Sequence, residues 1–298
     1  MSGADSGICP LIEVRNLVKR FDNKVVLDGF DLTVERGETC AIIGGSGSGK
    51  STFARLLVGL THADSGEILV DGTDLVGLGE HALDRIRRKF AVVFQSSALL
   101  DSMSVFENVA FPLVEARELK IAEIDARVHG TLRELDIDDA ATKLPGELSG
   151  GMAKRVGIAR AVVTEPEILV YDEPTSGIDP IGSRVIDELI ERMRVSHNVT
   201  SIVITHDMVT AFDVADRIAL LAGGKIVAQG PPQELFSSNI KAIVPFIVSS
   251  GVDFEELRPN AARVLPAIIR ARWNESHPPL APRARDWSWP WPWPVTTT

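Results

Sequence analysis

The sequence predicts an α/β fold built on a mainly parallel sheet, and two observations lead to this prediction. Short apolar, β-branched runs alternate with helix-like segments between residue 11 and about residue 250. The runs are TCAIIG, FAVVFQ, EILVYDE, TSIVITH and IALLAGGKIVAQG. The helix-like segments repeat apolar residues every three or four positions, as in the predicted helix from Ser183 to Arg194. Strands joined through helices pair in parallel, because the helix carries the chain back across the sheet.

Composition indicates a well-formed core in an acidic protein. The chain has 298 residues, of which 45% are apolar and 24% charged, and its formal net charge is −10. This balance excludes disorder of the whole chain and argues against nucleic acid as a partner. No apolar run approaches the ~18 residues that cross a bilayer. Cys9 and Cys40 lack metal-site spacing and the N-terminus lacks a basic start, so we expect reduced thiols and no secretory signal.

Two segments depart from the alternation of strands and helices. Between Ser96 and Gly151 no β run occurs and ELKIAEIDARVHGTLRELDI has a helical pattern, so we expect an inserted helical subdomain at about residues 96–158. Residues 251–298 hold all five tryptophans and eight of the 17 prolines. Because proline interrupts helices, this C-terminal extension is predicted to be an irregular tail. The alternative is that its indoles dock on a partner or at a membrane interface.

The strongest functional signal is a glycine-rich loop between a predicted strand and a predicted helix. Residues 44–52 read GGSGSGKST and match G-x-x-x-x-G-K-[ST]. Glycines let backbone N–H groups surround phosphate oxygens, and the following helix points its positive end at them. Lys50 adds a charge for the β- and γ-phosphates, and Ser51 offers a hydroxyl to Mg²⁺. The residues predicted to bind the triphosphate are Gly44, Gly45, Ser46, Gly47, Ser48, Gly49, Lys50, Ser51 and Thr52.

A pair of carboxylates follows the apolar run ILVY. Asp172 and Glu173 fall at the end of this predicted strand, at the sheet edge where the phosphate loop also lies. Asp172 is suited to hold Mg²⁺ through water, and Glu173 to polarise the water that attacks the γ-phosphorus. Two acids after a strand are on their own more often a helix cap or a turn. The phosphate loop favours the catalytic interpretation.

Further motifs, in order along the chain, resemble those of ATP-binding-cassette (ABC) ATPases. Residues 148–152 (LSGGM) resemble the signature motif, and residues 176–179 (SGID) the D-loop. Gln95 resembles the Q-loop glutamine, His206 the switch histidine, and Phe21 the aromatic residue that stacks on adenine. Without the other motifs, Gln95 would be interpreted as a surface amide and Phe21 as a core residue.

The resemblance implies a P-loop NTPase fold of the ABC ATPase type over residues 11–250. Such a fold has a RecA-like core, an antiparallel β edge and the inserted helical subdomain. The resemblance also implies a head-to-tail homodimer with two ATP molecules and Mg²⁺ at its interface. Ser149, Gly150 and Gly151 of one protomer would grip the ATP held by the other, and Asp179 would align the interface. ATP binding would then favour closure of the dimer, and hydrolysis would release it.

The same resemblance implies individual roles around the γ-phosphate. Glu173 and His206 are both present, so each site of a homodimer is expected to be competent in hydrolysis. The implied catalytic residues are Lys50, Gln95, Glu173 and His206, and the implied metal ligands are Ser51, Gln95 and Asp172.

Among cassette ATPases, a transporter subunit fits this chain best. The interval between Lys50 and Ser149 lacks the sustained heptads of repair-type members, and translation-type members carry two cassettes. Residues 94–113, Met152 and DEPTSGIDP resemble Mla-type ATPases, which power phospholipid transporters of the MCE class. We therefore expect an integral membrane permease, an MCE-domain protein and a small STAS-domain protein as partners, at the cytoplasmic face of the inner membrane.

Two alternatives remain open. The first is the ATPase of an amino-acid or lipoprotein transporter, and the second is a soluble assembly factor in which ATP only controls dimerisation. In a transporter, the helical subdomain would receive a coupling helix of the permease in a groove. The residues expected around this groove are Gln95, Leu99, Leu100, Met103, Val105 and Phe106. The alternative for each apolar residue among them is burial inside the subdomain.

Overall fold

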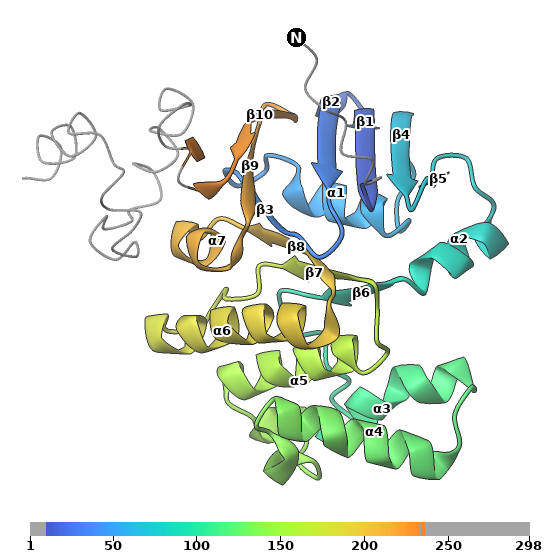
Figure 1. Ribbon diagram of the computed structural model, residues 1–298, viewed down its shortest axis with the longest axis vertical. Helices are drawn as coiled ribbons and strands as arrows, with labels where there is room; N and C mark the ends of the chain where they lie inside the picture. The colour runs from blue at the N-terminus through green and yellow to red at the C-terminus, as the bar shows by residue number, and fades with distance from the viewer. Residues whose placement is uncertain (1–9, 233, 236–298) are drawn as a thin grey trace, which may run out of the picture. The chain divides into compact units, whose positions relative to one another are not determined.

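The computed structural model describes residues 10–232 and 234–235, and Figure 1 labels its elements. The strands are β1 (Ile12–Phe21), β2 (Lys24–Val34), β3 (Thr39–Ile43), β4 (Ser65–Val70), β5 (Thr73–Asp74), β6 (Phe90–Val93), β7 (Ile168–Asp172), β8 (Thr200–Thr205), β9 (Arg217–Ala222) and β10 (Lys225–Gly230). The helices are α1 (Lys50–Leu57), α2 (Glu80–Arg87), α3 (Val105–Ala116), α4 (Ile121–Glu134), α5 (Gly150–Val162), α6 (Pro180–His197) and α7 (Met208–Val214). The expectations for Cys9 and for residues 251–298 lie outside the described residues.

A six-stranded sheet in the order β10-β9-β3-β8-β7-β6 carries the site. The neighbours from β9 to β6 pair in parallel, and β10 pairs antiparallel to β9. Strands β3 and β8 are buried at every residue, as expected for apolar runs covered on both faces. The predicted parallel α/β class is confirmed. The run IALLAGGKIVAQG forms two strands rather than one, because Gly223 and Gly224 turn the chain with φ of 58° and 78°.

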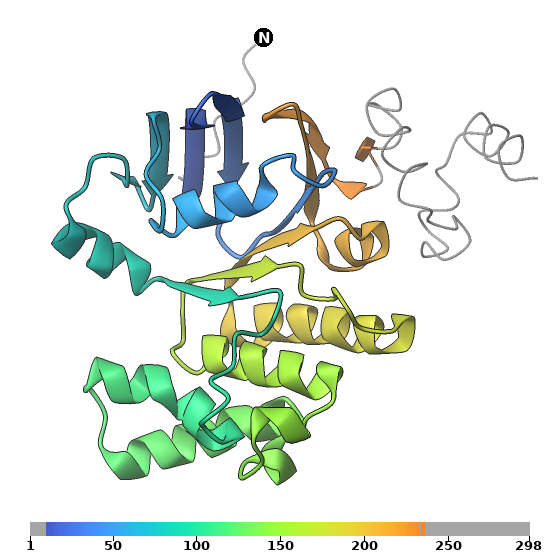
Figure 2. The same ribbon diagram turned by 180° about the vertical axis from the view of Figure 1, so that it is seen from behind.

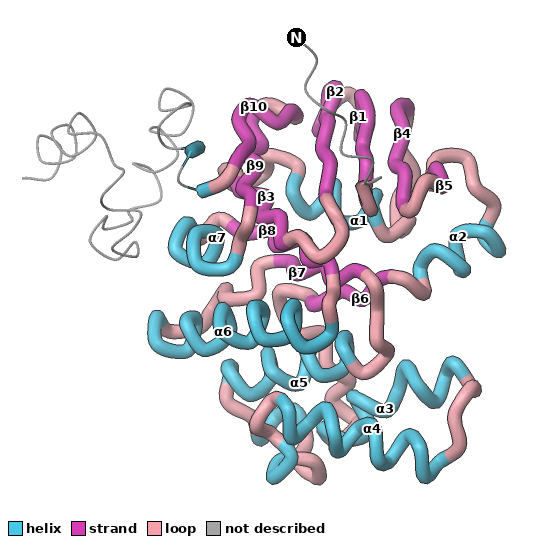
Figure 3. The backbone as a smooth tube through the Cα atoms, viewed as in Figure 1, coloured by secondary structure: helices cyan, strands magenta, loops and turns pink. Residues whose placement is uncertain are grey.

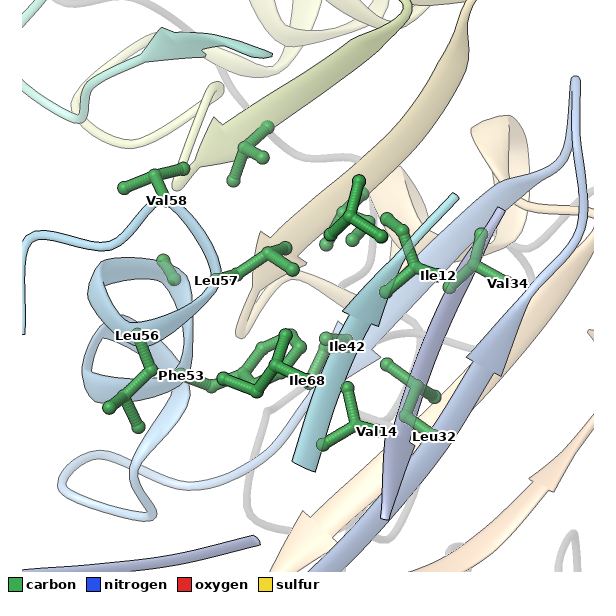
Figure 4. Packing of buried hydrophobic residues seen from close by; sticks show 14 of the residues in the cluster. Ile12, Val14, Leu32, Val34, Ile42, Phe53, Leu56, Leu57, Val58 and Ile68 are labelled. Atoms are coloured by element: carbon green, nitrogen blue, oxygen red, sulfur yellow. The ribbon is translucent and has the colours of Figure 1, made fainter. Parts of the chain in front are cut away.

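A separate antiparallel sheet, in the order β2-β1-β4-β5, packs with α1 on one side of the six-stranded sheet (Figures 1 and 2). Figure 4 shows the apolar cluster that joins them, with Phe53 of α1 beside Ile68 of β4 and Ile42 of β3. The ring centroids of Phe53 and Phe30 lie 4.6 Å apart. The expected antiparallel β edge is confirmed, and its core holds α1 against both sheets.

Helices α5 and α6 lie on the other side of the six-stranded sheet, and α3 and α4 pack beyond α5 (Figures 1 and 3). All regular structure between β6 and β7 is helical, with short 3-10 turns at Asp138–Ala140 and Pro145–Glu147. The predicted helix from Ser183 to Arg194 lies inside α6. Residues 118–137 have a helical pattern, but helix α4 begins only at Ile121. A short non-helical segment separates it from α3, which ends before Arg117, where φ is 56°.

In the part of the chain that the structure describes, no helix combines the length and the apolar character that a membrane crossing requires.

Candidate active site

The glycine-rich loop lies between β3 and α1, and its glycines divide into two kinds. A Cβ on Gly44 would lie 2.5 Å from the carbonyl oxygen of Leu221, and one on Gly49, where φ is 112°, would lie 2.9 Å from Cδ2 of Leu27. These glycines let the loop approach β9 and β2 more closely than any other residue permits. A Cβ on Gly45 or Gly47 would meet nothing within 4 Å. The loop is therefore fastened at both ends and open in its middle.

The start of α1 offers the positive end of a helix to an anion. Its N-cap is Gly49, no side chain caps the helix, and its first turn holds no acidic residue. Nζ of Lys50 donates to the carbonyl oxygens of Gly44 at 2.7 Å and Gly45 at 3.3 Å. Burial lowers the pKa of Lys50, while the charges of Glu173 and Asp172 oppose that shift. Uncapped helix N–H groups and a buried ammonium fit the phosphates of a nucleotide.

Ser51 and Asp172 meet at the carboxyl end of β7, where Mg²⁺ would be held. The Ser51 hydroxyl donates to Oδ1 of Asp172 over 3.5 Å. Burial raises the pKa of Asp172, the charge of Glu173 adds to this, and the bond from Ser51 opposes it. The described residues hold no group of three or more His, Cys, Asp or Glu side chains placed to bind a metal ion. The hydroxyl and carboxylate fit Mg²⁺, which commonly combines one or two protein ligands with phosphate oxygens and water.

The structure places Glu173 directly beside His206. Oε2 of Glu173 lies 2.7 Å from Nδ1 of His206, and it also accepts from Thr205 Oγ1 at 3.4 Å. The Glu173 side chain is 13% exposed and that of His206 65% exposed. Glu173 follows β7 with a φ of 52°, an uncommon left-handed backbone for this residue type. The acid and the histidine, which are 33 positions apart in the chain, therefore form one unit at the sheet edge.

Gln95 lies on the loop after β6 and faces the segment that follows Glu173. Its side-chain amide donates to the hydroxyl of Ser176 over 3.1 Å. Within the described residues, no hydrogen bond links Gln95 to Ser51 or Asp172. Its role as a metal ligand therefore stays a prediction.

The remaining predicted residues are not joined to the phosphate loop in this chain. Ser149 caps α5 by accepting from the Met152 N–H at 3.3 Å, and Asp179 caps α6 by accepting from Ile181 and Gly182 at 3.0 Å each. These backbone bonds lower the pKa of Asp179. Phe21 is 47% exposed, and Nζ of Lys19 lies 5.1 Å from its ring centroid. Among the described residues, no hydrogen bond connects Ser149, Asp179 or Phe21 with the loop, so their roles stay predictions.

Sequence reasoning did not single out Lys154, which the structure places inside the site. Lys154 is 5% exposed, and its Nζ donates to the carbonyl oxygens of Gln95 at 2.6 Å and Glu173 at 3.2 Å. Burial lowers its pKa, and the Glu173 and Asp172 charges oppose that shift. The sequence feature that could have indicated Lys154 is its spacing of four residues from Ile158, which places both residues on the buried face of a predicted helix.

Comparisons with known proteins agree with this geometry. Residues 27–176 match the family described as ABC transporter. The intermembrane phospholipid transport system ATP-binding protein MlaF of Haemophilus influenzae is 39% identical over 237 residues, which cover 80% of this chain and 90% of that protein. The methionine import ATP-binding protein MetN of Rhizobium johnstonii is 41% identical over 228 residues, which cover 76% of this chain and 63% of that protein.

A solved structure has the same fold. It is the dimeric post-hydrolysis state of the ATP-binding cassette MJ0796, bound to ADP and Pi. It aligns with a TM-score of 0.68 and 29% identity, over 74% of this chain and 98% of that chain. The fold that the motifs implied is thereby confirmed.

Proposed function

The chain belongs to the ABC transporter family, and we propose that it is the ATP-hydrolysing subunit of a transporter that moves phospholipids. The observation that carries hydrolysis is the meeting of the phosphate loop, Asp172 and the Glu173–His206 pair at one edge of the sheet. ATP binding needs the loop alone, whereas cleavage also needs a base beside the γ-phosphate. Glu173 is the candidate base.

Each residue of this group has a distinct part in the proposed reaction. Lys50 and the N-terminus of α1 hold the phosphates, and Ser51 and Asp172 would hold Mg²⁺, which supplies positive charge for the phosphate oxygens. A water oxygen attacks the γ-phosphorus while the bond to the oxygen bridging the β- and γ-phosphorus breaks. Glu173 accepts the proton that the water loses. His206, in contact with Oε2 of Glu173, keeps that carboxylate in place.

We propose that a second copy completes the site. Ser149 and Gly150 are exposed at the start of α5, where helix N–H groups favour an anion. Phe21 and Asp179 are exposed as well. These motif residues are exposed and, among the described residues, make no hydrogen bond to the phosphate loop of their own chain. This arrangement fits a head-to-tail homodimer, in which each ATP contacts Ser149 and Gly151 of the other protomer.

The surface between α3 and α4 suits the expected permease. A groove of about 380 Å³ lies there, with Met103, Phe106, Ala110, Phe111, Val114, Ile121 and Ile124 as its apolar lining. Met103 and Phe106 are two of the residues expected at this place. Val105, also expected there, is fully buried, because it is the first residue of α3 and points into the subdomain. We propose that the groove receives an apolar helix of the permease, at the cytoplasmic face of the membrane.

Phospholipid as the cargo is favoured by the extent of similarity to MlaF, because this chain spans 90% of that protein. An MCE-domain protein and a small STAS-domain protein are proposed as further partners. The second candidate is an amino-acid transporter, which the similarity to MetN favours. The match spans 63% of MetN, so more than a third of that protein has no counterpart in it.

The test uses the full chain reconstituted in vesicles with the permease that purifies with it. Glu173→Gln keeps the shape of the side chain but removes the base, so we expect ATP to bind and phospholipid movement to stop. Val195→Ala, at an exposed position of α6, is the matched control and retains transport. Phospholipid movement by Glu173→Gln at the wild-type rate contradicts the proposed mechanism. Methionine uptake without phospholipid movement in the wild-type complex selects the second candidate.

A further inference from the structure

Lys154 joins three segments that the sequence separates widely. It lies in α5, the helix that begins after Ser149, and its side chain is buried. Its ammonium donates to the carbonyl oxygen of Gln95 at 2.6 Å and to that of Glu173 at 3.2 Å. One side chain thus connects the helix behind the signature motif, the Gln95 loop and the end of β7.

The acceptor at Glu173 is a backbone that needs support. Its φ of 52° is unfavourable for a residue with a Cβ, so neighbouring contacts must hold it. Its N–H donates to the carbonyl oxygen of Ile204 at 2.8 Å, which ties one side of the residue to β8. Its carbonyl oxygen accepts from Ser176 N at 3.2 Å and from Lys154. This backbone directs the carboxylate at His206, so Lys154 acts on the aim of the proposed base.

The same face of α5 also holds the rest of the Gln95 loop. Arg160 donates to the carbonyl oxygens of Ser97 at 2.7 Å and Ala98 at 2.8 Å. Both acceptor residues have left-handed backbones, with φ of 59° and 45°. A Cβ on Gly157 would lie 3.3 Å from Cβ of Ser97, so the helix and the loop are in close contact. Lys154, Gly157 and Arg160 are spaced by three residues and line one face of the helix.

Of the three α5 residues that contact the Gln95 loop, Lys154, Gly157 and Arg160, only Lys154 also donates a hydrogen bond to Glu173. A buried ammonium is unfavourable unless polar groups surround it, and two carbonyl acceptors with two carboxylates nearby provide that surrounding. An apolar residue would pack in the helix at no such cost. The buried charge lies where it can fix the geometry of the reacting groups.

We propose that Lys154 is a positioning residue for the reaction: it holds the Glu173 backbone and the Gln95 loop in register with the helix that begins at Ser149. The inference rests on the proposed ATP hydrolysis. Displacement of α5 changes the position of the ammonium, and with it the aim of the Glu173 carboxylate. The helix that grips one ATP is in this way linked to the base that acts on the other.

The test compares Lys154→Met, Lys154→Gln and Arg160→Met in the full chain, purified with its permease. We measure kcat and KM for ATP, together with ATP affinity and Tm. Lys154→Met is expected to lower kcat by about 10- to 100-fold, because misplacement of a reacting group by ~1 Å has an effect of that order. ATP affinity and KM should stay near the wild-type values, because Lys50 and the phosphate loop are unchanged. Lys154→Gln retains an N–H donor and should recover part of kcat.

Arg160→Met is the matched control, because it loosens the Gln95 loop and leaves the Glu173 carbonyl contact in place. Its loss of kcat should be smaller than that of Lys154→Met. Wild-type kcat in Lys154→Met overturns the inference. It is also overturned if Lys154→Met and Arg160→Met lose kcat, ATP affinity and Tm to the same extent as each other. If Lys154→Met does not fold, a wild-type kcat in Lys154→Gln overturns it. Absence of ATP hydrolysis by the wild-type complex is a separate result, which refutes the proposed function instead.

Discussion

Replacing Gly44 by alanine tests how closely the phosphate loop depends on the core beneath it. The added Cβ would lie 2.5 Å from the carbonyl oxygen of Leu221 and 2.8 Å from Oγ of Ser48. An ordinary carbon–oxygen contact is about 3.3 Å, so the loop must move by roughly 0.8 Å. Overpacking of this kind costs about 1–3 kcal/mol, which for a domain of this size lowers Tm by about 2–12 °C. Because Lys50 donates to the Gly44 carbonyl, its ammonium moves too.

The measurements are thermal unfolding and kcat/KM for ATP hydrolysis. A shift of Lys50 on this scale predicts a loss of kcat/KM of about 10- to 100-fold. Gly45→Ala is the control for stability, because its added Cβ meets nothing within 4 Å. Its Tm should equal that of the wild type. If Gly44→Ala and Gly45→Ala unfold at the same temperature, the close approach of the loop to β9 does not have the effect that we infer from it.

Two further predictions concern Mg²⁺ and pH. Ser51→Ala removes one of two paired oxygens, so hydrolysis should need more Mg²⁺ than in the wild type; an unchanged Mg²⁺ titration argues against a metal at this pair. Asp179→Ala removes the cap of α6 and should lower Tm at neutral pH. Because folding lowers the pKa of Asp179, this difference in Tm is complete above the ordinary aspartate pKa and disappears as pH falls through the lowered one. A difference in Tm that persists at low pH assigns the effect to something other than the carboxylate.

The parts of the fold and site that can be predicted from the sequence are those determined by residues close together along the chain. Strand β3 and the loop after it form a local pattern of apolar residues, glycines and a lysine, and the structure has this strand and loop at that place. The family resemblance implied roles at the same γ-phosphate for Glu173 and His206. The structure brings the two side chains into contact because they follow neighbouring strands of a parallel sheet.

What escaped prediction depends on contacts between distant segments. A lysine in a helical pattern gives no indication of its acceptor, and the acceptors of Lys154 lie 59 and 19 residues away. The family resemblance placed Val105 around the groove together with Phe106, with burial inside the subdomain as the alternative. Val105 is buried, because a helix places adjacent residues on different faces. In the sequence, IALLAGGKIVAQG is one apolar run, because apolar residues lie on both sides of its two glycines. In the structure these glycines form the turn between β9 and β10.

The close approach of Gly49 to Leu27 makes the nucleotide loop part of the same cooperative unit as β2. Local opening of the hairpin formed by β1 and β2 would remove the surface against which the loop packs. The loop would then lose its ordered conformation in the same opening event. Amide hydrogens of β2 and of β3 should then exchange with solvent through one shared opening event. A triphosphate held in the loop would slow exchange in β2, although its phosphates touch no residue of that strand.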